Sequence, residues 1–123
     1  MKKKRQRVKK VLIIDDESGV IHVIQELLTD MEHEVSSFTD PEEGEAAALE
    51  NEYDLMIIDI RMPKKNGAEI TENILKQKPR AKILINTGYP DDPAVQRALD
   101  AGASGLLLKP FEIEKIIDFL KET

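Results

Sequence analysis

Cysteine and tryptophan are absent from this sequence, and histidine occurs only as His22 and His33. The lack of cysteine excludes disulfide bonds, zinc–thiolate sites and thiol nucleophiles, and two histidines are too few for a histidine-rich metal site. No apolar run approaches the roughly 20 residues of a membrane-spanning helix. The apolar residues 11–14, which follow a basic start, are fewer than the roughly 7–15 at the core of a signal peptide. We therefore expect a soluble, cytoplasmic domain without a membrane partner.

The 123 residues that are present favour one folded domain. Apolar residues make up 41% of them, enough for a buried core, and charged residues make up 34%. Residues 1–10 carry seven of the 18 cations and no acid, so residues 11–123 hold 11 cations against 24 acids, a net charge of −13. Such an acidic body disfavours direct binding of nucleic acid by the folded part.

We predict that residues 1–10 form a basic arm that is flexible or begins the first strand, and that residues 11–123 form the domain. A basic run of this kind is usually a solvated tail. Contact with RNA, with an acidic lipid or with a partner protein is the alternative.

Five apolar segments alternate with helical patterns along the chain. Residues 11–14, 55–58 and 106–108 are continuously apolar, which is typical of strands covered on both faces. Five strand–helix units with short connections predict an α/β fold, in which a doubly wound parallel sheet has helices on both faces. The predicted strands are residues 11–15, 34–38, 54–60, 82–86 and 105–109.

Capping residues and apolar periodicity predict the helices. Asp40 before Pro41, Asn66, and Asp92 before Pro93 indicate the starts of the second, third and fourth helices, and Gly102 indicates the end of the fourth. Apolar residues at helical spacing predict the first and last helices. They are Val20, Ile21, Ile24, Leu27, Leu28 and Met31 in the first helix, and Ile113, Ile116, Ile117 and Leu120 in the last.

Polar residues follow or end four of the predicted strands. They are Asp15, Asp16 and Glu17 at the first strand, Asp59 at the third, Thr87 at the fourth and Lys109 at the fifth. Ligands of an open parallel sheet bind outside the carboxyl ends of its strands, so we expect these side chains to converge. Each residue alone is compatible with a structural role, such as a turn aspartate or a surface lysine. Their joint occurrence indicates a functional site.

Asp59 carries the strongest signal, because it ends a buried apolar run. A buried carboxylate is costly unless it is paired or bound to a metal. The nearby charges of Asp15 and Asp16 would repel it unless a cation joined them. An oxygen-only cluster suits a hard divalent ion, Mg²⁺ first. Such a pocket suits attack by Asp59 on phosphorus, with Lys109 and the Thr87 hydroxyl binding the phosphoryl oxygens.

From Val11 to about Leu120, the sequence closely resembles the receiver (response-regulator, CheY-like) domain of two-component signal transduction. The motifs that carry the resemblance are the acid pair after the first strand, the apolar run ending in Asp59, Met62-Pro63-Lys64-Lys65-Asn66-Gly67, Asn86-Thr87-Gly88, Ala101-Gly102-Ala103-Ser104-Gly105 and Lys109-Pro110-Phe111. The resemblance implies a flavodoxin-like (βα)5 fold with five helices and strand order 2-1-3-4-5. It also implies a signalling switch rather than a metabolic enzyme, in which a histidine kinase or phosphotransfer protein phosphorylates Asp59 and a downstream target reads the change.

The resemblance further implies roles for the site residues. Mg²⁺ would be bound by Asp16, Asp59 and the backbone carbonyl of Arg61, with Asp15 helping through water, and the phosphoryl oxygens would be held by Thr87 and Lys109. The peptide bond between Lys109 and Pro110 is typically cis in this family.

Two features of the chain bear on switching. Leu106 stands where the family often has Phe or Tyr, so we expect the output surface (the fourth helix, fifth strand and fifth helix) to respond weakly or by a backbone route. Arg61 and Tyr89 are long side chains at the pocket rim, and we expect them to shield the phosphoryl group from water.

The same residues argue against two other functions. A phosphohydrolase with an aspartate nucleophile usually has a second Asp two residues further on, where this chain has Arg61. A flavodoxin-like electron carrier needs a Ser/Thr/Gly-rich phosphate loop and aromatic residues, whereas this chain has acids there and an aromatic content of 4%. Four forms of the switch family stay open: a free-standing regulator, a phosphorelay intermediate, a receiver excised from a larger regulator, and a receiver-like binding module that is not phosphorylated.

Overall fold

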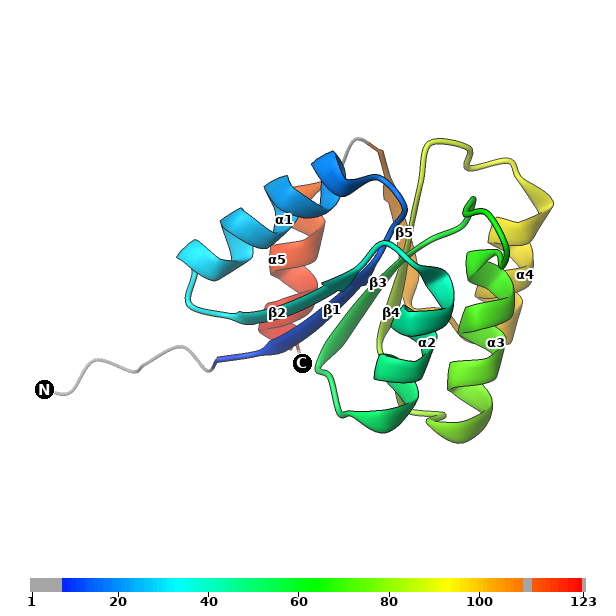
Figure 1. The fold of residues 1–123 in the computed structure, drawn as a ribbon, viewed down its shortest axis with the longest axis horizontal. Helices are drawn as coiled ribbons and strands as arrows, with labels where there is room; N and C mark the ends of the chain where they lie inside the picture. Colours follow the sequence, from blue (N-terminus) through cyan, green and yellow to red (C-terminus); the bar gives the residue numbers. More distant parts are fainter. Residues whose placement is uncertain (1–7, 110–111, 123) are drawn as a thin grey trace, which may run out of the picture.

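Strands and helices alternate throughout the computed structural model, which describes residues 8–109 and 112–122 (Figure 1). The strands are β1 (Lys10–Ile14), β2 (Glu34–Phe38), β3 (Leu55–Asp59), β4 (Ile83–Thr87) and β5 (Gly105–Leu108). The helices are α1 (Ser18–Asp30), α2 (Pro41–Glu50), α3 (Gly67–Gln77), α4 (Pro93–Ala101) and α5 (Ile113–Glu122). All strands pair in parallel in the order β2-β1-β3-β4-β5, which confirms the predicted fold class and strand order.

Four of the five predicted strands were wrong at one or both ends, and residues 34–38 alone were predicted as found. Pairing of Lys10 with Glu34 starts β1 one residue early, and pairing of Thr87 with Leu108 ends β4 one residue late. Asp15 and Lys109 therefore lie in loops just beyond their strands. Asp54, Ile60 and Lys82 were also placed in strands by the sequence and lie outside them.

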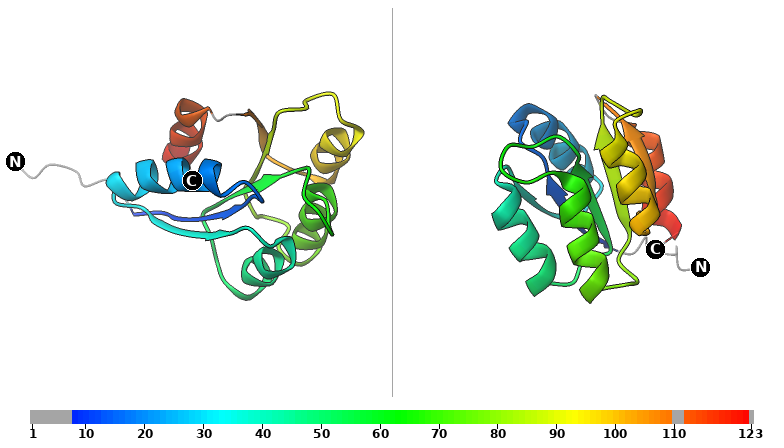
Figure 2. Two further views of the ribbon diagram at one scale, coloured as in Figure 1. Left: turned by 45° about the horizontal axis from the view of Figure 1, so that its top comes forward. Right: turned by 90° about the vertical axis from the view of Figure 1, so that its right-hand side faces the viewer.

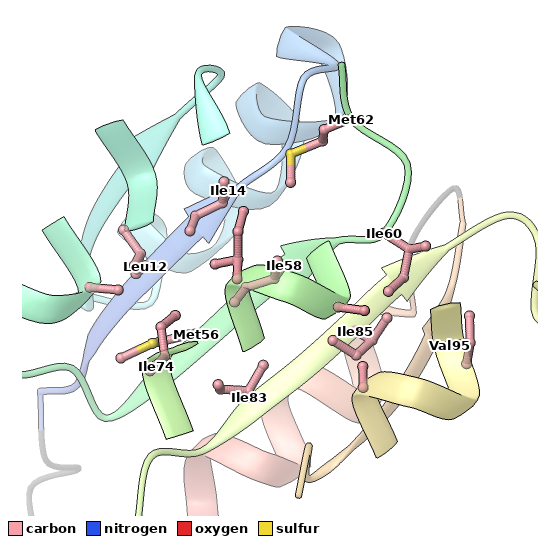
Figure 3. Packing of buried hydrophobic residues seen from close by; sticks show 14 of the residues in the cluster. Leu12, Ile14, Met56, Ile58, Ile60, Met62, Ile74, Ile83, Ile85 and Val95 are labelled. Carbon is pink, nitrogen blue, oxygen red and sulfur yellow. The ribbon is translucent and has the colours of Figure 1, made fainter. Parts of the chain in front are cut away.

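Two helical layers cover the sheet, with α1 and α5 on one face and α2, α3 and α4 on the other (Figure 2). Neighbouring residues of a strand point to opposite faces of the sheet. Since helices cover both faces, both sets of side chains are buried and apolar. One core packs under α2–α4 and includes Leu12, Ile14, Met56, Ile58, Ile83 and Ile85 (Figure 3). The other packs under α1 and α5 and includes Val11, Ile13, Leu55, Ile57, Leu84 and Leu107.

The capping residues confirm three predicted helix starts. The side chain of Asp40 accepts a hydrogen bond from the Glu42 amide, and Asn66 and Asp92 cap α3 and α4 in the same way. Gly102 ends α4 with a φ of 117°, a left-handed conformation that favours glycine.

The predicted apolar faces of α1 and α5 were too wide. Leu27 is 38% exposed, because α1 directs Ile21, Ile24 and Leu28 to the core and Leu27 lies beside that stripe. In α5, Ile116 and Leu120 are buried, whereas Ile113 and Ile117 are half-buried.

The predicted basic arm overlaps β1, since Lys10 already pairs with β2 and the Lys9 side chain is buried. Residues 1–7 of that arm lie outside the described residues. Among the helices of the described part, none has the length and apolar character needed to cross a membrane.

Candidate functional site

The carboxyl ends of β1, β3, β4 and β5 bring the predicted polar residues to one edge of the sheet. Asp15 follows β1, Asp59 and Thr87 end β3 and β4, and Lys109 follows β5. Asp59, Thr87 and Lys109 line a cavity of about 510 Å³ there. Its lining consists of Asp16, Glu17, Asp59, Arg61, Thr87, Gly88, Tyr89 and Lys109.

Four carboxylates cluster at this site. Asp15, Asp16, Glu17 and Asp59 each bring one carboxylate oxygen to within 4.8 Å of the others. Asp15 and Asp59 are 1% and 3% exposed, whereas Asp16 and Glu17 lie open to solvent. Within the described residues, Oδ2 of Asp59 is buried and has no hydrogen-bond partner. A buried oxygen without a partner, in a cluster of oxygen ligands, fits a hard divalent cation such as Mg²⁺.

Burial also changes the protonation of these acids. It raises the pKa of Asp59 to about 7, and the charge of Asp15 adds to this effect while Lys109 opposes it. Burial likewise raises the pKa of Asp15, against the Glu17 amide that donates to Asp15 Oδ1 at 2.9 Å. Without a cation, simultaneous ionisation of all these acids is therefore unfavourable. A bound cation would stabilise the ionised carboxylates.

Lys109 is the cation that the protein itself supplies. Its Nζ lies 3.3 Å from Oδ1 of Asp59 and 3.4 Å from Oδ2 of Asp15, and it is also bonded to Glu17. Burial works to lower the pKa of Lys109, but the bond with Glu17 and the two aspartate charges outweigh it and raise the pKa. The sequence predicted the approach of Lys109 to the aspartates but not its pairing with Glu17. Pro110, whose peptide bond was predicted to be cis, lies outside the described residues.

Thr87 is buried at the end of β4, and its Oγ1 accepts a hydrogen bond of 3.0 Å from the Tyr89 amide. Because the hydroxyl oxygen accepts this bond, its hydrogen can be donated into the cavity. Thr87 thus has the position and the hydrogen-bonding capacity predicted for it.

Arg61 and Tyr89 lie together at the rim of the cavity. The guanidinium carbon of Arg61 lies 3.7 Å from the centroid of the Tyr89 ring, and Nε of Arg61 donates to Oδ2 of Asp92 at 2.9 Å. The sequence placed both long side chains at the rim, but the ion pair with Asp92 was not predicted. Leu106 is half-buried and packs against the core under α2–α4.

Gly67 holds the start of α3 against the backbone that carries Asp59. Its amide donates to the Ile60 carbonyl at 2.9 Å, and a Cβ on Gly67 would lie 2.0 Å from the carbonyl oxygen of Asp59. Only a residue without a side chain permits this approach.

Comparison with known proteins gives one family for nearly the whole chain. The model of the response regulator receiver domain matches residues 11–121. The transcriptional regulatory protein DegU of Brevibacillus brevis is 35% identical over 114 residues, which are 90% of this chain and 48% of DegU. The chain thus spans about half the length of the curated relatives it matches.

Two solved structures have the same fold at similar identity. The CheY-like receiver domain protein of Methanospirillum hungatei JF-1 has a TM-score of 0.87 and 29% identity, over 94% of this chain and 96% of that one. The response regulator protein TrrA of Thermotoga maritima, solved in complex with Mg²⁺ and BeF, has a TM-score of 0.79 and 28% identity, over 94% and 98% of the two chains.

Proposed function

Because this chain belongs to the family of response regulator receiver domains, we propose that Asp59 accepts a phosphoryl group and that the modification switches the binding of a downstream target. The donor is a histidine kinase or a phosphotransfer protein. The observation that carries this proposal is the Asp59 carboxylate, which is buried at the end of β3 with Lys109 at 3.3 Å and acids around it. A cluster of this kind is costly as structure alone.

Mg²⁺ is the cofactor that the donor set fits. We assign it to the carboxylates of Asp16 and Asp59 and to the backbone carbonyl of Arg61, with Asp15 helping through water. When bound, the ion screens the carboxylates and the incoming phosphoryl group from each other. This assignment agrees with the excess of acid charge over the single lysine in the pocket.

The residues of the chain then divide the work of phosphoryl transfer. An oxygen of ionised Asp59 attacks phosphorus in line with the phosphohistidine P–N bond; that bond breaks, and its electron pair leaves with the imidazole nitrogen. Lys109 and the Thr87 hydroxyl bind the oxygens of the transferred group. The product is an acyl phosphate on Asp59, and slow hydrolysis by water returns the carboxylate.

The family is one of signalling switches, and the site agrees with that role. A phosphohydrolase that uses an aspartate nucleophile usually has a general acid two residues further on, whereas this chain has Arg61, which is held by Asp92. We therefore expect negligible turnover of small phosphate esters. The kinase and the target are macromolecular partners, and the output of the whole protein depends on them.

Mass spectrometry after treatment with acetyl phosphate tests the proposal. We expect the mass of one added phosphoryl group on Asp59 when Mg²⁺ is present, and no adduct after chelation with EDTA or in Asp59→Asn. Asp54→Asn is the matched control, because Asp54 lies at the opposite edge of the sheet and binds the Lys10 amide. Labelling that survives Asp59→Asn, or that needs no metal, would contradict the mechanism. An unlabelled wild type would identify a binding module that is not phosphorylated.

A further inference from the structure

Arg61 joins the end of β3 to the segment that leads into α4. It lies two residues after Asp59, and both partners of its side chain, Tyr89 and Asp92, belong to the loop between β4 and α4. The Arg61 side chain is 56% exposed and that of Asp92 is 17% exposed. Within residues 8–109 and 112–122, Arg61 forms an ion pair with Asp92 and with none of the four clustered acids.

Asp92 divides its two carboxylate oxygens between Arg61 and α4. Oδ2 accepts from Nε of Arg61, whereas Oδ1 accepts from the Ala94 amide at 2.9 Å and so caps the first turn of α4. The backbone amide of Asp92 also donates to the Tyr89 carbonyl at 3.0 Å. Movement of Arg61 would therefore change the contacts of the residue that caps α4.

The same loop is bonded to the pocket from its other end. The Tyr89 amide donates to Thr87 Oγ1, and the Tyr89 ring lies under the guanidinium of Arg61. Arg61 itself borders two depressions, the cavity of the acid cluster and a second one that reaches Asp92 and Ala94. Arg61 thus lines both the cavity in which a phosphoryl group on Asp59 would stand and the depression beside the cap of α4.

We propose that Arg61 is a two-position residue: it pairs with Asp92 in the unmodified protein and transfers to the phosphoryl oxygens once Asp59 is modified, which releases the cap of α4 from β3. This inference rests on the proposed function of Asp59. A phosphoryl group brings up to about two negative charges and three acceptor oxygens. A guanidinium binds such a group through two parallel hydrogen bonds, whereas it meets Asp92 here through Nε. A partly exposed ion pair is weak enough to yield to that competitor.

Transfer of Arg61 provides a route to α4 that needs no aromatic side chain in β5. Leu106 is aliphatic and half-buried in the core under α2–α4. When Arg61 leaves Asp92, the Tyr89 ring loses its stacked partner, while the Tyr89 amide keeps its bond to Thr87 and the Ala94 amide keeps its bond to Asp92. Signal would thus pass through the loop before α4 rather than through a buried ring.

NMR of the arginine side chains tests the transfer, with beryllofluoride and Mg²⁺ as a stable mimic of the phosphoryl group. We expect the Nε–H resonance of Arg61 to move when wild-type protein is saturated, together with the amide resonance of Ala94. Arg80 is an internal control in the same spectrum, since it is exposed in the loop before β4, at the end of the sheet away from the acid cluster. Its resonance should stay in place.

Affinity for beryllofluoride supplies a second readout, in which two variants should act in opposite directions. Asp92→Asn frees Arg61 but keeps an N-cap residue, so we expect binding about two- to fivefold tighter. Arg61→Gln should bind about two- to fivefold more weakly, and the double variant should match Arg61→Gln. The matched control, Arg97→Gln, should bind as the wild type does. A merely structural role of the ion pair would make both single variants weaker.

The outcomes separate this inference from the function on which it rests. Failure of the wild type to bind beryllofluoride at all would overturn the proposed function, and this inference with it. Binding that leaves the Arg61 resonance unmoved, or weaker binding by Asp92→Asn, would overturn the transfer of Arg61 alone.

Discussion

At the scale of single residues, the environment of Asp59 opposes the charge that its chemistry needs. Burial and the charge of Asp15 both favour the protonated acid, and Lys109 offsets this only in part. An unscreened carboxylate here is therefore a high-energy group, and partners that add positive charge are bound strongly by it. The poorly screened charge that makes the Asp59 oxygen reactive also lowers the free energy of unfolding.

The pH dependence of stability should show this cost directly. Folding raises the pKa of Asp59 from its ordinary value of 3.8 to about 7, so the folded state binds more protons than the unfolded state between those values. The free energy of unfolding of metal-free protein should then fall as pH rises from about 4 to about 7. We expect Asp59→Asn to lose most of this fall, with a remainder from the raised pKa of Asp15, and to be more stable than wild type at pH 7 by roughly 1–3 kcal/mol.

Urea unfolding in EDTA at several pH values is the measurement. Asp118→Asn is a suitable control, because Asp118 is exposed on α5, and it should keep the slope of the wild type. Equal pH slopes for wild type and Asp59→Asn would show that the ionised carboxylate is not destabilising.

Single residues also show where sequence reasoning succeeds and where it stops. Asp59, Thr87 and Lys109 could be predicted as neighbours because parallel strands bring their carboxyl ends to one edge. The pairing of Lys109 with Glu17 and of Arg61 with Asp92 could not. Both depend on the rotamers of long side chains in loops, which neither periodicity nor spacing determines.

At the scale of elements, the site depends on how closely α3 approaches β3. Gly67 begins α3 beside the backbone of Asp59, and the Thr71 hydroxyl donates back to the Gly67 carbonyl at 2.7 Å. We expect Gly67→Ala to destabilise the protein by about 2 kcal/mol or more, because a Cβ cannot fit 2.0 Å from the Asp59 carbonyl oxygen.

Thermal unfolding of Gly67→Ala beside Gly19→Ala checks this. A Cβ on Gly19 in α1 would have nothing within 4 Å, so that variant should be neutral or stabilised by up to about 1 kcal/mol. Similar melting temperatures for the two variants would mean that α3 can move away from β3 at little cost. In that case the shift of α3 should disturb the site, and phosphorylation of Asp59 should fall in Gly67→Ala but not in Gly19→Ala.

Element boundaries were predictable to the extent that local chemistry sets them. Asp40, Asn66 and Asp92 cap the helices that their positions predicted, because a capping side chain satisfies amides a few residues away. Strand ends differed by a residue because pairing with a neighbouring strand determines them, as with Lys10 and Glu34. The exposure of Leu27 likewise depends on which face of α1 the sheet covers.

At the scale of the whole molecule, the two apolar cores hold the strands in register, and the charged residues of the site gather at the carboxyl ends of the strands. The apolar side chains of β1, β3 and β4 are buried on both faces, so the strands end at a fixed place relative to one another. Four acids then meet against one lysine at that edge, in a body whose net charge from residue 11 onward is −13. Stability of the fold and occupancy of the site are thus coupled through electrostatics.

Magnesium should therefore stabilise the entire fold, and more at high pH than at low pH. At a free concentration ten times its dissociation constant, an ion that binds only the folded state adds about 1.4 kcal/mol to the free energy of unfolding. We expect that gain at pH 8 and a smaller one at pH 5, where the ion must displace the proton that the raised pKa of Asp59 retains.

Urea unfolding with and without MgCl₂, at matched ionic strength in NaCl, measures this gain. Asp16→Asn should lose most of the gain, because it removes an exposed anionic ligand, whereas Asp30→Asn at the far end of α1 should keep it. Stabilisation that is equal at the two pH values, or undiminished in Asp16→Asn, would place the ion somewhere other than this cluster.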